Sequence, residues 1–307
     1  MSIKTSPNVV SSRFLAITPD GKEVVSASVH KCTIHVWSLA DDQVCVIPTH
    51  SPVSSLTLTP DGTYVVCGHF DRSVGLFSLD NREQVRSFTG HCSWVSTVTV
   101  TPDGKRIIGA GGVSGDICVW SLESGEQEQC IHVSGWHVNR VVATPDGRHV
   151  VCGTADGSIQ VMSLENGEQV QRIERVGTAS VDITPDGRYI VCGGCGGHVV
   201  ACSLESDERL FDIHGHSERV SDVAITPDGR YAVSCGRDSM IHVWSLENKG
   251  QHVQAIVSEF PEIDCLAITP DGRHVVAGAS CSDVLRVWPL DSEEMDSLVA
   301  QVEALGV

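Results

Sequence analysis

Short apolar runs alternate with polar turns along the whole chain, and the same alternation returns every 40 to 43 residues. In each repeat two β-branched runs flank a Thr-Pro-Asp-Gly turn, as residues 98–100 and 107–108 do in the third repeat. Proline presets φ, aspartate can bond its own backbone, and glycine takes the positive φ that such a turn needs. The first two apolar runs of each repeat are therefore predicted to form a β-hairpin.

Two further strands are predicted after each hairpin. A third apolar run follows, such as residues 34–39 or 241–246, and a polar turn then leads to a fourth run, such as residues 84–88. Four antiparallel strands in a repeat of this length form one blade of a β-propeller. The turn begins seven times, at Thr18, Thr59, Thr101, Thr144, Thr184, Thr226 and Thr269. The sequence therefore predicts an all-β, seven-bladed propeller.

The spacing of the fourth strands predicts how the ring closes. These strands fall roughly 13–17 residues before the next turn, and the same offset from Thr18 reaches the first five residues. No fourth strand is evident after the last third strand, residues 285–290. We therefore expect an N-terminal strand at residues 2–5 to complete the seventh blade, which removes the last open sheet edge. Residues 1–290 are predicted to form a complete propeller domain.

Residues 291–307 have a different, helical pattern. Acidic residues fill the first turn, Gly306 stands at the end, and one apolar stripe runs along the segment. The stripe consists of Met295, Leu298, Val299, Val302 and Leu305. We expect a short acidic amphipathic C-terminal helix, which packs either on the propeller or on a partner.

The charge and cysteine content narrow the function classes. A formal net charge of −18, from 21 basic and 39 acidic residues, disfavours nucleic-acid binding. Such a charge either attracts a basic partner segment or only keeps the protein soluble. No apolar stretch is long enough to span a membrane, and the N-terminus lacks the apolar centre of a signal peptide. Thirteen cysteines without a secretory signal indicate a reducing compartment, so we expect a cytoplasmic protein, with the nucleus as the alternative.

Several motifs make residues 1–290 resemble one family. Third strands end in Val-Trp-Ser-Leu-Glu or a close variant, and Gly-His pairs occur at Gly90-His91 and Gly215-His216. With the repeat period, these features resemble the WD-repeat (WD40) family, although serine replaces the family's aspartate after tryptophan. The Thr-Pro-Asp-Gly turns and Ser-Leu-Glu endings look most like propellers of NACHT- or STAND-type signalling ATPases. The resemblance implies a non-enzymatic interaction domain without a cofactor.

Four residues of the sixth repeat contain the residue types of a hydrolase triad: His216, Ser234, Asp238 and Trp244. The resemblance implies that they form a buried hydrogen-bond network that holds the blade together. No Gly-x-Ser-x-Gly elbow or other oxyanion-hole motif accompanies them, so we expect no catalytic site. The third repeat keeps the histidine and tryptophan but has Gly109 in the position of the serine.

A second group, Cys192, Cys195, His198 and Cys202, offers the four soft ligands that tetrahedral zinc favours. The first and last of these cysteines occupy strand positions that face the core in other repeats, so the repeat itself explains them. We therefore expect no metal. The glycine-rich runs 109–112 and 193–197 lead into strands and contain no lysine, which disfavours nucleotide binding.

In WD-repeat proteins, the loops before each first strand and between second and third strands form one rim, where partners dock. Register places eight large side chains there: Phe70, Arg72, Trp94, Trp136, His137, Arg219, Arg237 and Phe260. Tryptophan and arginine often dominate protein contacts. The two rim tryptophans do not occupy the repeated third-strand position that Trp37, Trp120, Trp244 and Trp288 hold. They either contact a partner or cap their own blades.

These observations predict a scaffold or sensor module that binds a protein or peptide partner on this rim, within a larger multidomain protein or complex. A substrate receptor of a modifying complex, such as a ubiquitin ligase, is the alternative. A propeller enzyme would need a metal or carboxylate cluster at the central channel, and no such cluster repeats in the sequence. Fold alone does not choose among these classes.

Overall fold

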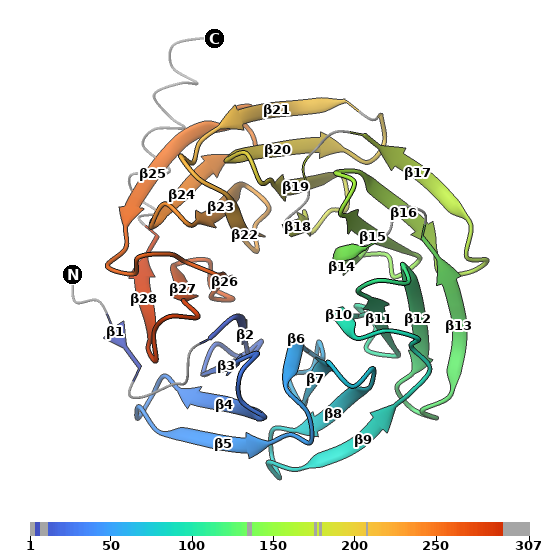
Figure 1. Ribbon diagram of the computed structural model, residues 1–307. Helices are drawn as coiled ribbons and strands as arrows, with labels where there is room; N and C mark the ends of the chain where they lie inside the picture. The colour runs from blue at the N-terminus through green and yellow to red at the C-terminus, as the bar shows by residue number, and fades with distance from the viewer. Residues whose placement is uncertain are drawn as a thin grey trace.

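The computed structural model describes residues 4–6, 12–133, 137–174, 177, 180–206 and 208–290. Within this part of the chain, seven four-stranded antiparallel sheets stand around a central axis like the blades of a propeller (Figure 1). The predicted all-β, seven-bladed fold is thereby confirmed. The predicted helix within residues 291–307 lies outside the described residues. None of the described residues forms a helix that is long and apolar enough to cross a membrane.

The strands of each blade run outward from the axis in the order in which they follow one another in the chain. The innermost strands are β2 (Phe14–Ile17), β6 (Val53–Leu58), β10 (Val95–Val100), β14 (Val138–Ala143), β18 (Ser180–Ile183), β22 (Val220–Ile225) and β26 (Cys265–Ile268). The second strands are β3 (Glu23–Ala27), β7 (Tyr64–His69), β11 (Arg106–Gly111), β15 (His149–Thr154), β19 (Tyr189–Gly193), β23 (Tyr231–Gly236) and β27 (His274–Gly278).

The third and fourth strands complete each blade toward the outside of the ring. The third strands are β4 (Thr33–Ser38), β8 (Val74–Ser78), β12 (Asp116–Ser121), β16 (Ile159–Ser163), β20 (His198–Ser203), β24 (Met240–Ser245) and β28 (Leu285–Pro289). The outermost strands are β5 (Val44–Pro48), β9 (Gln84–Phe88), β13 (Gln127–His132), β17 (Gln169–Ile173), β21 (Arg209–His214), β25 (Gln251–Val257) and β1 (Lys4–Thr5).

The ring closes through β1, which comes from the opposite end of the chain from its three partner strands. Lys4 stands opposite Val287 and Thr5 opposite Arg286 in an antiparallel pair with β28. The predicted closure by an N-terminal strand is therefore confirmed. Within the described residues this strand covers Lys4–Thr5 and ends before Ser6.

The seven Thr-Pro-Asp-Gly turns join the innermost and second strands, and each is held by the same hydrogen bonds. The threonine hydroxyl donates to the aspartate carboxylate over 2.5–2.7 Å. The carboxylate also accepts the amide two residues further on. The glycine takes φ between 67° and 74°, a conformation that disfavours any side chain. This closed network explains why the same four residues return in every blade.

The hydrophobic core consists of seven clusters, and each cluster lies between two neighbouring blades. Strand residues alternate between the two faces of a blade, so both faces can be buried against neighbours. Cys67, Cys152, Cys192 and Cys202 are fully buried in these clusters. All thirteen cysteines are free thiols. The core fixes the strands of the ring, so the sequence can vary in the loops at its two ends.

Candidate partner-binding site

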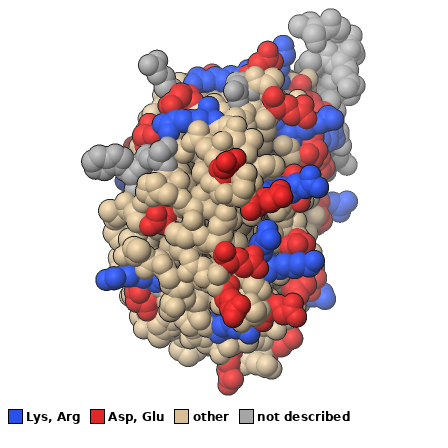
Figure 2. All heavy atoms as spheres, turned by 90° about the vertical axis from the view of Figure 1, so that its right-hand side faces the viewer, with Lys and Arg blue, Asp and Glu red and all other residues tan. Residues whose placement is uncertain are grey.

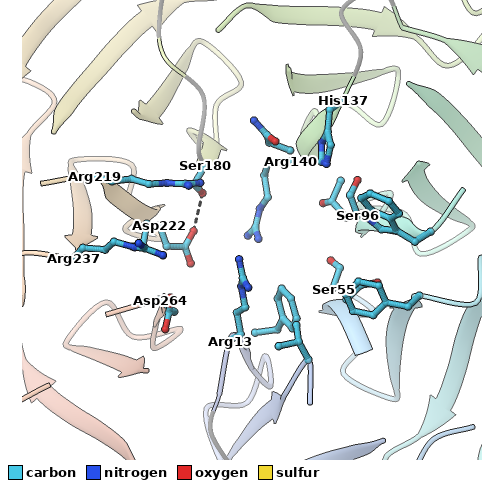
Figure 3. A pocket seen from close by; sticks show the side chains of 18 residues that line it. Arg13, Ser55, Ser96, His137, Arg140, Ser180, Arg219, Asp222, Arg237 and Asp264 are labelled. Atoms are coloured by element: carbon cyan, nitrogen blue, oxygen red, sulfur yellow. Dashed lines mark hydrogen bonds between the residues drawn. The ribbon is translucent and has the colours of Figure 1, made fainter. Parts of the chain in front are cut away.

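A pocket of about 300 Å³ opens at the axis of the ring. It lies at the end that carries the loops before the innermost strands and between second and third strands, which we call the top face (Figure 3). The Thr-Pro-Asp-Gly turns lie at the opposite end. The pocket, called the central pocket below, is lined by Arg13, Phe14, Val29, Ser54, Ser55, Phe70, Trp94, Ser96, Thr97, His137, Asn139, Arg140, Ser180, Arg219, Ser221, Asp222, Arg237 and Asp264.

The wall of the pocket is built by the first residues of the innermost strands. Polar side chains there hold neighbouring blades together: the Ser55 hydroxyl accepts the Val98 amide at 3.0 Å, and Thr97 bonds the following blade in the same way. Asp222 accepts the Leu266 amide of the next blade at 3.1 Å. Each of these side chains ties a strand to the next blade around the ring, so the wall is rigid.

Four arginines, supplied by three blades and their loops, face the pocket. Arg13 directly precedes β2, Arg140 lies on β14, and Arg219 and Arg237 flank β22 and β23. Figure 3 shows Arg13 and Arg140 pointing into the pocket from opposite sides. Arg140 takes the register position that Ser55 holds in its blade, four residues before the threonine of the turn. An arginine there extends into the pocket where a serine would stay in the wall.

The pocket also contains two carboxylates, and both are bonded to the protein. Asp222 accepts the Ser180 hydroxyl at 2.7 Å and the Val223 amide at 3.0 Å, besides the bond to the next blade. Asp264 accepts the Ser280 amide at 2.7 Å. These hydrogen bonds hold the two carboxylates in the wall.

Five of the eight predicted rim residues line the central pocket: Phe70, Trp94, His137, Arg219 and Arg237. The Trp94 indole contacts the His137 ring edge-on, with centroids 6.0 Å apart. It also packs on Gly112, where a Cβ would lie only 2.3 Å from the indole. Trp94 is therefore half-buried, and part of the indole caps its own blade while part faces the pocket.

Two other pocket side chains remain available for contacts. Phe70 is 46% exposed although it is a large apolar residue. The buried Nδ1 atom of His137 has no hydrogen-bond partner among the described residues. A bound partner can cover the exposed Phe70 ring.

The remaining three rim predictions differ from the structure or fall outside it. Phe260 does not face the pocket: it is only 4% exposed and packs edge-on against Trp288 in the core between the sixth and seventh blades. Its placement on the rim was wrong, because an aromatic in this loop finds a large apolar neighbour inside. Arg72 is exposed in a turn with φ of 75° and does not line the pocket. Trp136 lies outside the described residues.

The prediction missed Arg13 and Arg140. Arg140 lies inside an innermost strand, whereas the predicted rim residues lie in loops, and Arg13 directly precedes β2. A signal was present in the repeats: at the register of Arg140, other blades carry Ser55, Thr97 or Ser180. A long cation among small polar residues marks a departure from what the repeat needs.

The four residues of the sixth blade with triad-like chemistry form one chain of hydrogen bonds. The Trp244 indole donates to Ser234 at 2.9 Å, and Ser234 is 2.7 Å from His216 Nε2. His216 Nδ1 lies 3.0 Å from Asp238. Burial alone would raise the pKa of Asp238, but the bonds from His216 and two backbone amides outweigh it and lower that pKa. The His216 side chain is fully buried, which leaves no room for a substrate at this chain of bonds.

One group of side chains in the described residues has the spacing of a metal site: His216, Asp238 and His242. Both ring nitrogens of His216 already lie within hydrogen-bond distance of Asp238 and Ser234. The pKa of His242 is lowered to about 4, first by burial and then by the neighbouring His216 and His252. This arrangement fits a structural network better than a metal centre.

The cysteine–histidine quartet considered for zinc does not assemble in the described structure. Cys192 and Cys202 are buried in the core between the fourth and fifth blades, whereas Cys195 is exposed. His198 Nδ1 lies 2.7 Å from Asp212 on the neighbouring strand β21. The repeat register therefore accounts for the two buried cysteines.

Away from the pocket, charges of both signs are mixed. Figure 2 shows one side of the ring, where basic and acidic side chains are interspersed around uncharged surface. The pocket differs from this surface because four arginines face two carboxylates there, while acidic residues outnumber basic ones almost twofold in the whole chain.

Comparisons with known proteins agree with the fold. A periodic tryptophan protein 2 homolog of Neurospora crassa is 31% identical over 126 residues, which cover 40% of this chain and 14% of that protein. The beta-1 subunit of a guanine nucleotide-binding protein of Homarus americanus is 30% identical over 146 residues, or 45% of this chain and 41% of the subunit. An uncharacterized WD repeat-containing protein of Synechocystis is 31% identical over 142 residues, with 45% and 40% covered.

Each alignment thus spans less than half of the relative. The family model described as "WD domain, G-beta repeat" matches residues 41–78, 82–121, 128–162, 207–245 and 253–289. These segments cover more than half of the chain, and each runs from the outermost strand of one blade into the third strand of the next. The chain therefore belongs to the WD40 repeat family.

Proposed function

We propose that this protein is a non-enzymatic interaction module that binds a protein or peptide partner on its top face. The observation that carries the proposal is the central pocket, where Phe70, Trp94 and His137 lie beside arginines on a rigid ring. Exposed aromatics and arginines around a concave site are the residues that most often dominate protein contacts. The pocket is too polar and open to resemble a water-excluding active site.

The relatives support this class of function. The Homarus americanus relative is named as a subunit, and a subunit functions in an assembly with other chains. We infer that this propeller likewise acts within a larger protein or complex, as a sensing domain or an adaptor in the cytoplasm. The likeness of its turns to propellers of NACHT- and STAND-type ATPases favours the sensing role. A substrate receptor of a modifying complex would present the same top face to its target.

Capture of partners by the tagged protein tests the proposal. We expect Trp94→Ala and Arg219→Ala each to abolish capture of the proteins that wild type retains from an extract of its source cells. Trp94→Ala removes an apolar contact surface and Arg219→Ala removes an exposed cation, so both act on the pocket. Trp136 lies outside the described residues but is predicted to lie on the same rim. We therefore expect Trp136→Ala to abolish capture as well.

Arg188→Ala serves as the control, because this exposed arginine follows a Thr-Pro-Asp-Gly turn at the opposite end of the ring. Thermal unfolding of all variants shows whether the fold persists. If Trp94→Ala and Arg219→Ala both unfold as wild type does and still capture the same proteins, the partner binds elsewhere and the proposal is wrong.

A further inference from the structure

The arginines of the central pocket form few direct contacts with acidic side chains. The buried Asp182 carboxyl is near enough to Arg140 for the guanidinium to favour its charged form, but burial has the larger effect and raises the pKa of Asp182 to about 6. Within the described part of the chain, Arg13, Arg140 and Arg219 form no side-chain hydrogen bond or ion pair. Arg237 alone has a partner, Glu262, at 3.6 Å on an exposed surface, and such a pair contributes little. Among the residues outside the described part of the chain, segments 7–11, 134–136, 175–176 and 178–179 contain no aspartate or glutamate, and the acidic residues are Asp207 and five within 291–307.

The carboxylates of the pocket are directed to other partners than these arginines. Asp222 is only 7% exposed, and its oxygens accept one hydroxyl and two backbone amides. Asp264 is held by the Ser280 amide. Arg13 and Arg140 meanwhile point into the same pocket from opposite walls (Figure 3). Like charges that face each other in a confined site favour an anion between them.

The size and spread of the site indicate the form of that anion. A pocket of about 300 Å³ admits one or two side chains but no folded domain. The four arginines come from three different blades, so they enter the pocket from different walls. Several carboxylates spaced along a chain match such spread charges better than one compact group, and each can be held by a guanidinium fork.

We propose that an acidic segment of a protein partner inserts carboxylate side chains into the central pocket, among Arg13, Arg140, Arg219 and Arg237. This inference rests on the proposed function and specifies the chemistry of the partner. For this site it replaces the basic partner that was one of two readings of the net charge of −18, because the local balance of charge is opposite to that of the whole chain.

Binding of short peptides tests this inference directly. The probe is a fluorescein-labelled Gly/Ser peptide with a central run of glutamates, and its affinity is measured by fluorescence anisotropy. We expect the double variant Arg13→Gln/Arg140→Gln to bind about tenfold more weakly than wild type or worse, because two guanidinium–carboxylate pairs are lost. The affinity of wild type should also fall as salt rises from about 50 to about 200 mM.

Arg188→Gln/Arg273→Gln is the matched control. It removes the same net charge from two exposed arginines after Thr-Pro-Asp-Gly turns, far from the pocket. Its affinity for the glutamate peptide should stay within about twofold of wild type, because only long-range attraction changes. Equal weakening by both double variants would show attraction by overall charge and overturn the inference.

Three further peptides distinguish the chemistry of the occupant. Peptides of the same length with lysines or glutamines should bind at least about tenfold more weakly than the glutamate peptide. Equal binding of either would overturn the inference. A phosphoserine peptide that binds more than about tenfold more tightly than the glutamate peptide would overturn the assignment to carboxylates and point to a phosphorylated partner.

The capture experiment separates this inference from the proposed function. If Trp94→Ala abolishes capture while Arg13→Gln/Arg140→Gln leaves it intact, the top face binds a partner but the acidic segment is wrong. If none of these folded variants changes capture, the proposed function itself fails. The inference is supported if Trp94→Ala and Arg13→Gln/Arg140→Gln both abolish capture and the glutamate peptide binds as expected above.

Discussion

At the scale of single residues, the turns lower the pKa values of several of their recurring aspartates. The Thr18 hydroxyl and the Lys22 amide both donate to Asp20, and these bonds lower the pKa of Asp20 to about 2. The pKa values of Asp61, Asp103 and Asp186 are lowered chiefly by the same bond from their threonines. The native turn therefore prefers the charged carboxylate.

Stability should consequently depend on pH through these turns. The folded pKa of Asp20 lies below the ordinary value of 3.8, so its contribution is present above about pH 4 and is lost as the pH falls toward 2. We expect Asp20→Asn to lower the free energy of unfolding by about 1 kcal/mol or less at pH 7, since solvent screens this exposed site. The difference from wild type should vanish near pH 2, as measured by urea unfolding at both pH values.

Asp80→Asn provides the control for the change in charge alone, because Asp80 is exposed and accepts no hydrogen bond from the described residues. Asp80→Asn should leave the free energy of unfolding almost unchanged at both pH 7 and pH 2. A loss of stability in Asp20→Asn that is the same at pH 7 and pH 2 would contradict the role of the charged form.

At the scale of elements, blades of one design are held by different internal contacts. In the sixth blade, His216 links Asp238 to Ser234 and Trp244 through both ring nitrogens. In the third blade, Gly109 leaves no hydroxyl at the serine position. His91 Nε2 is buried there without a hydrogen-bond partner among the described residues. His216 should therefore stabilise the sixth blade more than His91 stabilises the third.

Truncating the two histidines should reveal this difference. His216→Ala removes the histidine partner of the Asp238 carboxylate, which is 7% exposed and keeps only the bonds from two backbone amides, and we expect it to cost about 3 kcal/mol. His91→Ala removes packing against Trp120 but strands no charge, and we expect it to cost about 1–2 kcal/mol. Each is the same His→Ala truncation at an almost fully buried site, so each controls for the other. Equal decreases in the thermal midpoint would contradict the prediction.

Sequence predicted the elements well because each blade repeats the same local rules. The turn residues and β-branched runs located the strands, and register separated Trp94 from the repeated tryptophans. The central pocket was only partly predictable, because its chemistry arises where several blades meet. The local sequence around Arg13 and Arg140 does not predict that they face each other across the axis. Phe260 was misplaced because burial of a loop aromatic depends on its neighbour Trp288, from another part of the repeat.

At the scale of the whole molecule, the junction between the first and seventh blades differs from the other six. Among the described residues, the apolar cluster there has four buried members, Val24, Trp37, Val276 and Leu285, with five partly buried apolar side chains packed against them, whereas the other clusters have nine to thirteen buried members. The seventh blade also depends on the two-residue strand β1 from the distant end of the chain. Less apolar burial makes this junction the place where the ring should open first.

Ser6 allows the closure to be tested with a matched control. Its amide donates to the Leu285 carbonyl at 3.0 Å, and its hydroxyl accepts the Leu285 amide at 2.7 Å. In the sixth blade, the Ser258 amide donates to Ser239 at 2.9 Å and its hydroxyl accepts the Phe260 amide at 3.0 Å. Proline at either position removes both bonds, but only those of Ser6 join the two ends of the chain.

We therefore expect Ser6→Pro to lower the thermal midpoint more than Ser258→Pro does. Loss of the Ser6 bonds releases β1 and exposes one edge of β28 at the junction with the fewest buried apolar residues among those described, whereas Ser258 lies next to a cluster of thirteen. Hydrogen exchange should accelerate first at the amides of β28 and β27 in Ser6→Pro. If exchange instead rises evenly over all seven blades, the ring unfolds as one unit and closure is no weaker than any other junction.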